Sequence, residues 1–316
     1  SSRGDWLAFG TQSGKLCIWS MTADGPQEAP CEAWPDDEPV MKVQFSPGGR
    51  WLATTCSGAC KDFGAPVRLW DLTTAPPDQA PRHLKHATPL DEDSLLAIAF
   101  SADDARLAAA YGYVAVVWDL TKEAPHAHEL GPFASSGGWI SALAVSPDRR
   151  WLAIGGGDVR VMLWDLTGAR TAPTALKGHS AGVNDLAFSV DGRWLASGSE
   201  DATTRLWDMA DATNPVALLR GQDLAVRKVL FGPGPAPRHL LTLGDEPNAR
   251  LFGIPDPLAD PAVLRRTVGP DIIGMAVSAD GLWIATSSVG DSKLMLWSAT
   301  DARRPRHELP LPTPSH

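Results

Sequence analysis

The chain has 316 residues, of which 44% are hydrophobic and 21% are charged, a composition typical of globular proteins that argues against disorder. Its formal net charge of -9 disfavours binding of DNA or RNA through a general basic surface, because a polyphosphate would be repelled. No run approaches the ~18 or more apolar residues that span a bilayer, and the N-terminus lacks the apolar core of a secretory signal. We therefore expect a cytoplasmic protein with no membrane segment in this chain.

An apolar residue followed by an aromatic residue recurs seven times, at spacings of 43 to 51 residues. The copies are Ile18-Trp19, Leu69-Trp70, Val117-Trp118, Leu163-Trp164, Leu206-Trp207, Leu251-Phe252 and Leu296-Trp297. A second apolar run precedes each copy, and these runs begin at Trp6, Trp51, Arg106, Trp151, Trp194, His239 and Trp283. Turns rich in Ser, Pro, Asp and Gly precede most of the second runs, and such residues supply the φ values of tight reversals. Each unit therefore reads as short β-strands without a helical period.

Polar segments that contain proline follow the aromatic positions, as at 73–77 and 121–125, and indicate exposed loops leading to outer edge strands. Four short strands in each unit agree with one blade of a β-propeller, for which repeats of about 40–45 residues are typical. The sequence therefore predicts an all-β, seven-bladed β-propeller with four-stranded antiparallel blades, in a single domain, 1–316. The predicted blades are 1–38 (partial), 39–87, 88–135, 136–178, 179–221, 222–268 and 269–316.

With these repeats, nearly the whole chain resembles the WD40-repeat family. The best copy runs from Gly178-His179 through Val183–Ser189 and Gly192–Gly198 to Asp201 and Leu206-Trp207-Asp208. For this copy we expect strands near 183–189, 194–199, 203–208 and 216–220. The regular repeats and the proline-rich connectors are similar to those in the propellers of large bacterial multidomain proteins. In such proteins WD repeats follow a signalling or effector module.

The first blade is expected to be incomplete. Only Ser1 to Asp5 precede the run at Trp6, so this chain has no sequence for the inner strand of that blade. The C-terminal tail could form an outer strand near 306–309, but its prolines make it a poor source of a central strand. We expect an upstream N-terminal domain or a separate chain to supply the missing strand.

His179, Ser197 and Asp201 have the side chains of a Ser-His-Asp hydrolase. The nucleophile-elbow pattern Gly-x-Ser-x-Gly is absent around Ser197, however. The WD40 resemblance implies instead that these three residues form a structural hydrogen-bond network with Trp207. We therefore expect no catalytic residue here, and loss of thermal stability in His179→Ala.

Cys56 and Cys60 lie close together in a long turn of the second blade. With His83 or His86 they could bind a metal, but the spacing is loose and there is no second cysteine pair. Free thiols or a local disulfide are the alternatives. We expect no metal and no cofactor, and the four cysteines agree with a reducing compartment.

Aligning the turns places a set of inner-strand residues at the propeller rim, where we expect a protein or peptide partner to bind. The predicted partner-binding residues are Met41, Lys42, Trp139, Asn184, Asp185, Arg227 and Lys228. A tryptophan beside Arg and Lys is the composition of interaction hot spots.

The resemblance implies a sensor, scaffold or autoinhibitory domain of a larger bacterial protein, and we expect this domain not to be an enzyme. The alternative is a propeller hydrolase or lyase with its active site in the channel. The inner strands offer Asp185 and little else for such chemistry.

Overall fold

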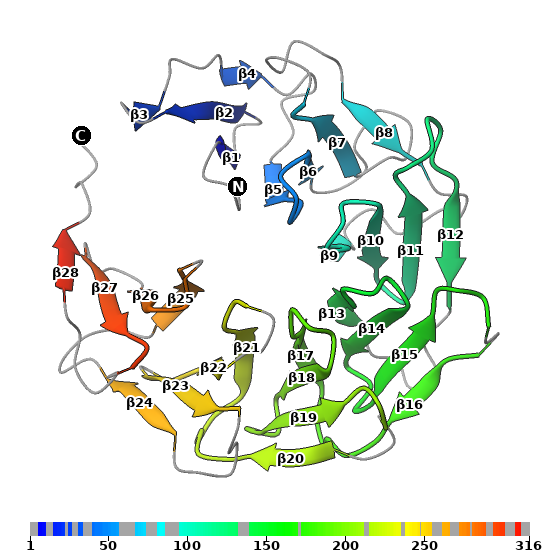
Figure 1. Ribbon diagram of the computed structural model, residues 1–316. Helices are drawn as coiled ribbons and strands as arrows, with labels where there is room; N and C mark the ends of the chain where they lie inside the picture. The colour runs from blue at the N-terminus through cyan, green and yellow to red at the C-terminus, as the bar shows by residue number, and fades with distance from the viewer. Residues whose placement is uncertain are drawn as a thin grey trace. The chain divides into compact units, whose positions relative to one another are not determined.

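The computed structural model describes residues 6–10, 15–22, 25–26, 31–33, 40–56, 67–73, 81–85, 95–131, 139–169, 172–211, 215–234, 238–246, 248–254, 261–265, 272–278, 280–288, 293–300 and 307–310. The chain divides into two compact units, Ser1–Ser135 and Ser136–His316. Every regular element in the described ranges is a β-strand, β1 to β28 (Figure 1). Within those ranges no helix is long and apolar enough to cross a membrane.

Three four-stranded sheets lie in the first unit, and we call them blades 1 to 3. Blade 1 contains β1 (Trp6–Gly10), β2 (Lys15–Thr22), β3 (Gly25–Pro26) and β4 (Cys31–Ala33). Blade 2 contains β5 (Val40–Phe45), β6 (Trp51–Cys56), β7 (Val67–Asp71) and β8 (Arg82–Leu84). Blade 3 contains β9 (Leu95–Phe100), β10 (Arg106–Tyr111), β11 (Val114–Asp119) and β12 (Ala127–Leu130).

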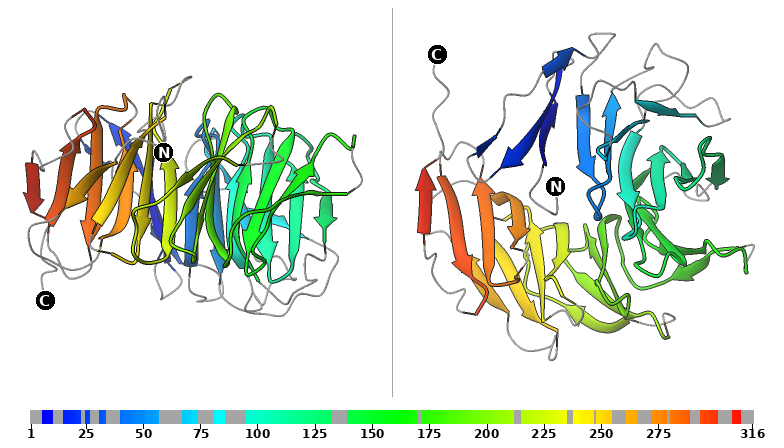
Figure 2. Two further views of the ribbon diagram at one scale, coloured as in Figure 1. Left: turned by 90° about the horizontal axis from the view of Figure 1, so that it is seen from below. Right: turned by 45° about the horizontal axis from the view of Figure 1, so that its top comes forward.

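Four more sheets, blades 4 to 7, form the second unit and follow one another in chain order from green to red in Figure 2. Blade 4 contains β13 (Ile140–Val145), β14 (Trp151–Gly156), β15 (Val161–Asp165) and β16 (Thr174–Leu176). Blade 5 contains β17 (Val183–Phe188), β18 (Trp194–Ser199), β19 (Thr204–Asp208) and β20 (Pro215–Leu219). Blade 6 contains β21 (Val226–Phe231), β22 (His239–Gly244), β23 (Asn248–Gly253) and β24 (Ala262–Arg265). Blade 7 contains β25 (Ile272–Val277), β26 (Trp283–Ser288), β27 (Lys293–Ser298) and β28 (His307–Pro310).

The fold class is the expected one: an all-β protein whose seven four-stranded antiparallel sheets are the blades of a seven-bladed β-propeller. The four strands expected in the best repeat are observed within one residue at each boundary, as β17 to β20. The expected outer strand near the C-terminus is β28, which pairs with β27.

Among the described residues, blade 1 has no inner strand, as expected. Its first strand, β1, corresponds to the second strand of the other blades and pairs only with β2 among the described strands. The sheet also contains the two-residue strand β3. It pairs with the end of β2 at Met21 and Thr22 and does not replace the inner strand.

The apolar cores of each unit lie between successive blades. Trp207 ends the third strand of blade 5, is fully buried, and packs with Leu163 and Val183 in a cluster shared by blades 4 and 5. Trp297 is fully buried in the same way in the cluster shared by blades 6 and 7. Burying an indole removes about 150–250 Å² of surface from water, which explains why the aromatic position recurs in every repeat.

The turns after the inner strands of blades 2 to 5 and of blade 7 have the expected chemistry. In blade 5 the Ser189 hydroxyl donates to Asp191 and accepts from Trp194 N, and Gly192 has a φ of 71°. The corresponding position of positive φ is Asp104 in blade 3, Arg149 in blade 4 and Gly281 in blade 7. These turns hold the first two strands of a blade in register.

Cys17 differs from the expectation of reduced cysteines, because it is disulfide-bonded. In the antiparallel pairing of β2 with β4, its Cα partner is Cys31. A separation of 14 residues in sequence does not reveal that two cysteines face each other across neighbouring strands. Cys60, His86 and the Cys56 side chain lie outside the described residues, so the choice between metal, thiol and disulfide there stays open.

Candidate functional site

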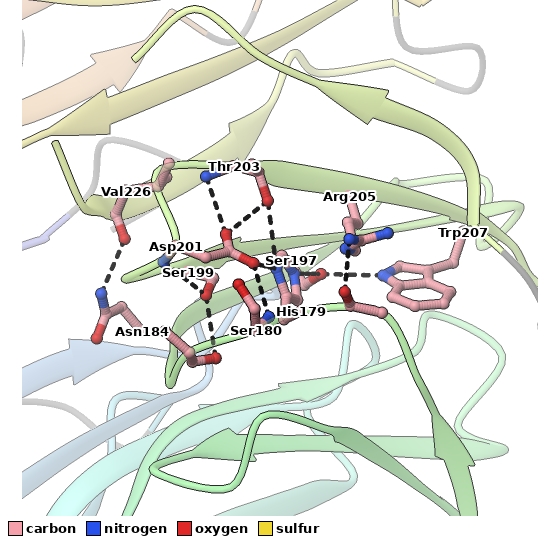
Figure 3. A network of polar contacts seen from close by, with 12 residues as sticks. His179, Ser180, Asn184, Ser197, Ser199, Asp201, Thr203, Arg205, Trp207 and Val226 are labelled. Carbon is pink, nitrogen blue, oxygen red and sulfur yellow. Dashed lines mark hydrogen bonds and ion pairs between the residues drawn. The ribbon is translucent and has the colours of Figure 1, made fainter. Parts of the chain in front are cut away.

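Blade 5 contains a continuous series of polar contacts that joins four side chains (Figure 3). The Trp207 indole Nε1 donates to Ser197 Oγ at 3.0 Å, and Ser197 Oγ lies 2.8 Å from His179 Nε2. His179 Nδ1 lies 2.9 Å from Asp201 Oδ2. The structure thus brings together all four residues that the WD40 resemblance assigned to a structural network.

Electrostatics favour a neutral His179 next to an ionised Asp201. Burial lowers the pKa of His179 below its usual 6.5 and outweighs the opposing effect of Asp201. Burial raises the pKa of Asp201, but hydrogen bonds from Thr203, Ser180 N and His179 outweigh it and bring this pKa to about 2. The neutral imidazole therefore donates from Nδ1 to the carboxylate and accepts the Ser197 hydroxyl proton at Nε2.

The order of contacts resembles that of a hydrolase triad, but the serine is inaccessible. Ser197 is fully buried, and its oxygen already accepts the Trp207 N–H. A nucleophile needs space beside it for a substrate carbonyl and for oxyanion donors. Within the described ranges, no three His, Cys, Asp or Glu side chains are grouped as metal ligands. The geometry at Ser197 therefore provides packing and no reactive group.

Blade 6 has a different polar network at the same place, which the sequence reasoning did not identify. Gln222 Nε2 donates to Thr242 Oγ1 at 3.2 Å. Glu246 accepts the backbone N–H groups of Asp223 and Leu224, and pairs with Arg250 at 3.1 Å. Glu246 lies four residues after Thr242, as Asp201 lies four residues after Ser197, so aligning the two repeats would have indicated it.

Two predicted rim residues, Asn184 and Asp185, contact the next inner strand. Asn184 Nδ2 donates to Val226 O at 3.0 Å, and Asp185 Oδ2 accepts Val229 N–H at 2.8 Å. Ser141 Oγ donates to Val183 O at 2.8 Å, which joins blade 4 to blade 5 in the same manner. Burial raises the pKa of Asp185 to about 6. These side chains connect β13, β17 and β21, and their role in partner binding stays a prediction.

Three of the exposed apolar side chains lie at the end of the blades where the inner strands begin. Trp139 precedes β13 and is 50% exposed, and Val159, in the turn between β14 and β15, is 39% exposed. A backbone hydrogen bond from Gly157 N to Trp139 O joins these two segments. Leu224, before β21, is 50% exposed at the corresponding end of blade 6. Val159 and Leu224 were not anticipated, because single apolar residues in turns carry no pattern.

Arg227 and Lys228 are both exposed at the same end of blade 6. Arg227 forms an ion pair with Asp245 at 2.7 Å and another with Glu200 at 3.8 Å. We refer to Trp139, Val159, Leu224, Arg227 and Lys228 as the rim surface. Lys42 is exposed on β5 of the first unit, and the Met41 side chain lies outside the described residues.

Comparison with known families agrees with this architecture. The family model "WD domain, G-beta repeat" matches residues 128–165, 171–208 and 263–298. Each match starts in or just before the outer strand of one blade and ends at or next to the third strand of the next, so the sequence repeat is offset from the blade by one strand. No curated protein matches the chain. WD40 repeats generally mediate protein–protein interaction and are typically not catalytic. Three repeats of the chain therefore match the WD40 family model, and all seven blades are built on the same strand pattern.

Proposed function

We propose that this domain binds a protein or peptide partner through the rim surface. The observation that carries the proposal is the exposure of both Trp139 and Val159, which lie in two segments of blade 4 joined by the hydrogen bond from Gly157 N to Trp139 O. An indole that is half exposed leaves apolar area in water, and burying it against a partner is favourable by about 25 cal/mol per Å². Tryptophan is also the residue type most enriched among binding hot spots.

Positive charge on the rim surface contributes less to the proposed binding than the sequence indicated. Arg227 forms ion pairs with both Asp245 and Glu200, so its charge is neutralised within the rim surface. Ion pairs of this kind on a surface contribute little to affinity but restrict which partners can approach. The expected partner therefore presents an apolar anchor for Trp139, surrounded by polar groups of both signs.

Two variants and a matched control test this proposal. We expect Trp139→Ala and Val159→Ser, used as baits in affinity purification, to lose a partner that wild-type protein retains. Val190→Ser is the control, because Val190 is 55% exposed in a turn at the opposite strand ends. With the purified partner, Trp139→Ala is expected to weaken binding by about 2 kcal/mol, roughly 30-fold. Equal loss with Val190→Ser, or no loss with Trp139→Ala, would contradict the proposal.

The wider role that we propose is that of a sensor, scaffold or autoinhibitory domain in a larger bacterial signalling or effector protein. In support, β1 pairs on one side only among the described strands, and such an edge can accept a strand from an upstream segment or another chain. Adding the upstream sequence, or the separate chain, is expected to raise the melting temperature by several degrees. An unchanged melting temperature would argue against this source of the strand.

A further inference from the structure

One aspartate joins the turns of blades 2 and 3. Asp104 has a φ of 61° in the turn between β9 and β10, and is 8% exposed. Its carboxylate accepts Gly48 N–H at 2.7 Å and Arg50 N–H at 3.1 Å, both in the corresponding turn of blade 2. Its carbonyl oxygen accepts the Trp51 indole N–H at 3.1 Å. Asp104 therefore fills the space between two successive turns with a carboxylate held by backbone donors.

At the same place between blades 6 and 7, the chain has no such side chain. The position of positive φ in the blade 7 turn is Gly281, with a φ of 70°. Phe231 ends β21 as Phe45 ends β5, and His239 begins β22 as Trp51 begins β6. Gly234 follows Phe231 by three residues as Gly48 follows Phe45, and Arg238 precedes His239 as Arg50 precedes Trp51, but the turn of blade 6 is two residues longer than that of blade 2.

A cavity of about 370 Å³ lies at this junction. Gly234, Arg238 and Gly281 line it at the turns, and Leu241, Leu251 and Ile284 form its apolar wall. These three apolar residues belong to the core shared by blades 6 and 7. The cavity thus opens on the apolar core at the position that Asp104 fills between blades 2 and 3.

The chemistry of the cavity suits an acidic side chain. Between described residues, Gly234 N and Arg238 N have no hydrogen-bond acceptor, and the exposed Arg238 guanidinium has no ion pair. In blades 2, 4 and 5 the arginine before the second strand lies over the following Trp, at 4.4 to 4.6 Å from the ring centroid. His239 replaces that Trp in blade 6. Asp280 also lines the cavity, but its carboxylate accepts from Ser278 Oγ and from Leu282 N within its own turn.

We propose that this cavity binds an Asp or Glu side chain from a segment of a partner protein, in the way that the chain's own Asp104 occupies the junction of blades 2 and 3. The ligand carboxylate is held by Gly234 N, Arg238 N and the Arg238 guanidinium, which are charge-assisted hydrogen bonds. An apolar neighbour in the ligand packs on Leu282, which is 53% exposed beside the cavity. This surface lies at the opposite strand ends from the rim surface and is independent of it.

Gly281→Asp is the sharpest test, because it gives blade 7 the residue that blade 3 already has. At the corresponding position of blade 3, Asp104 adopts the same left-handed backbone conformation as Gly281. An aspartate is therefore compatible with this conformation. A Cβ at Gly281 would meet Pro233 at 3.4 Å, which is close to ordinary contact. Gly192→Asp is the matched control: it has a φ of 71°, and its Cβ would lie 3.6 Å from Pro147.

The probe is a displayed library of random short peptides, selected on the wild-type chain and then measured by fluorescence anisotropy. We expect selected peptides to share an acidic residue next to an apolar one. Gly281→Asp and an Asp→Asn or Glu→Gln change in the peptide should each weaken binding at least about tenfold, whereas Gly192→Asp and Trp139→Ala should leave it unchanged.

Peptides without an acidic residue, or peptides that bind folded Gly281→Asp as well as wild type, would overturn the proposal. So would a library that yields only peptides sensitive to Trp139→Ala, although that result would support the rim surface. If Gly281→Asp fails to fold, Arg238→Glu replaces it, with the same expected loss and the same contradicting result.

Discussion

Blades 5 and 6 use different polar groups to hold the loop that leads into the inner strand. In blade 5 a neutral His179 bridges Ser197 and Asp201, and Asp201 accepts the Ser180 N–H at 3.0 Å. In blade 6 an uncharged Gln222–Thr242 contact is combined with a buried Glu246–Arg250 ion pair. Both carboxylates hold backbone donors of the loop that leads into the inner strand. The difference shows that the repeat requires an acceptor for that loop, and that the histidine is one of several ways to position it.

The largest effect is expected when the blade 6 ion pair is broken. Glu246→Ala leaves Arg250, which is 6% exposed, without its partner and removes the acceptor of two backbone N–H groups. Because an uncompensated buried charge is costly, we expect a loss of about 3–5 kcal/mol in the free energy of unfolding, measured by denaturant titration. Glu246→Ala combined with Arg250→Met should recover part of this loss. Equal stability of Glu246→Ala and wild type would show that the pair is dispensable.

Removal of the blade 5 histidine is expected to have the next largest effect. His179→Ala removes the acceptor of the buried Ser197 hydroxyl proton and one of the donors to Asp201. Each unsatisfied buried group costs about 1–3 kcal/mol, so we expect a loss of about 2 kcal/mol and a lower melting temperature. Gln222→Ala, the matched change in blade 6, removes one contact of 3.2 Å and should cost less. An unchanged melting temperature in His179→Ala would contradict a structural role for this network.

Two aspartates of blade 5 should give opposite dependences of stability on pH. The folded pKa of Asp201 is about 2, below the usual 3.8, so its contribution is complete above about pH 4 and is lost as pH falls towards 2. The folded pKa of Asp185 is about 6, above 3.8, so stability declines as pH rises from about 4 to 6. Asp201→Asn should remove the first dependence and Asp185→Asn the second, each read from melting temperatures across the pH range. Superimposable profiles for Asp185→Asn and wild type would contradict the burial of this carboxylate.

The smallest effect is expected from giving blade 6 the histidine of blade 5. Among the described residues, Gln222 Oε1 is buried without a hydrogen-bond partner. Gln222→His removes that acceptor and places an imidazole near Thr242 and Glu246. We expect a change within about 1 kcal/mol, in the stabilising direction, by thermal unfolding. A large destabilisation would show that the two networks are not interchangeable.

Most of the candidate site followed from the repeat, but its accessibility did not. Trp139 was identified by aligning the turns of the repeats, and it is half exposed. Arg227 was expected to make the rim positive, yet Asp245 and Glu200 come from turns of two different blades and neutralise it. A partner in another blade is roughly 45 residues away and has no fixed position in the sequence pattern.

The sequence by itself determined the seven repeats, the strands within the blades and the turns with positive φ, and its resemblance to WD40 repeats indicated the four-residue network of blade 5. These features depend on local alternation, turn chemistry and a motif contained in one repeat, so neighbouring residues are sufficient to specify them. The tertiary structure alone decided that Asn184 and Asp185 contact the next inner strand, that Cys17 is disulfide-bonded and that Gly281 borders a cavity. Each of these depends on which side chain of one strand or blade meets the next, and that is set by packing between segments distant in sequence.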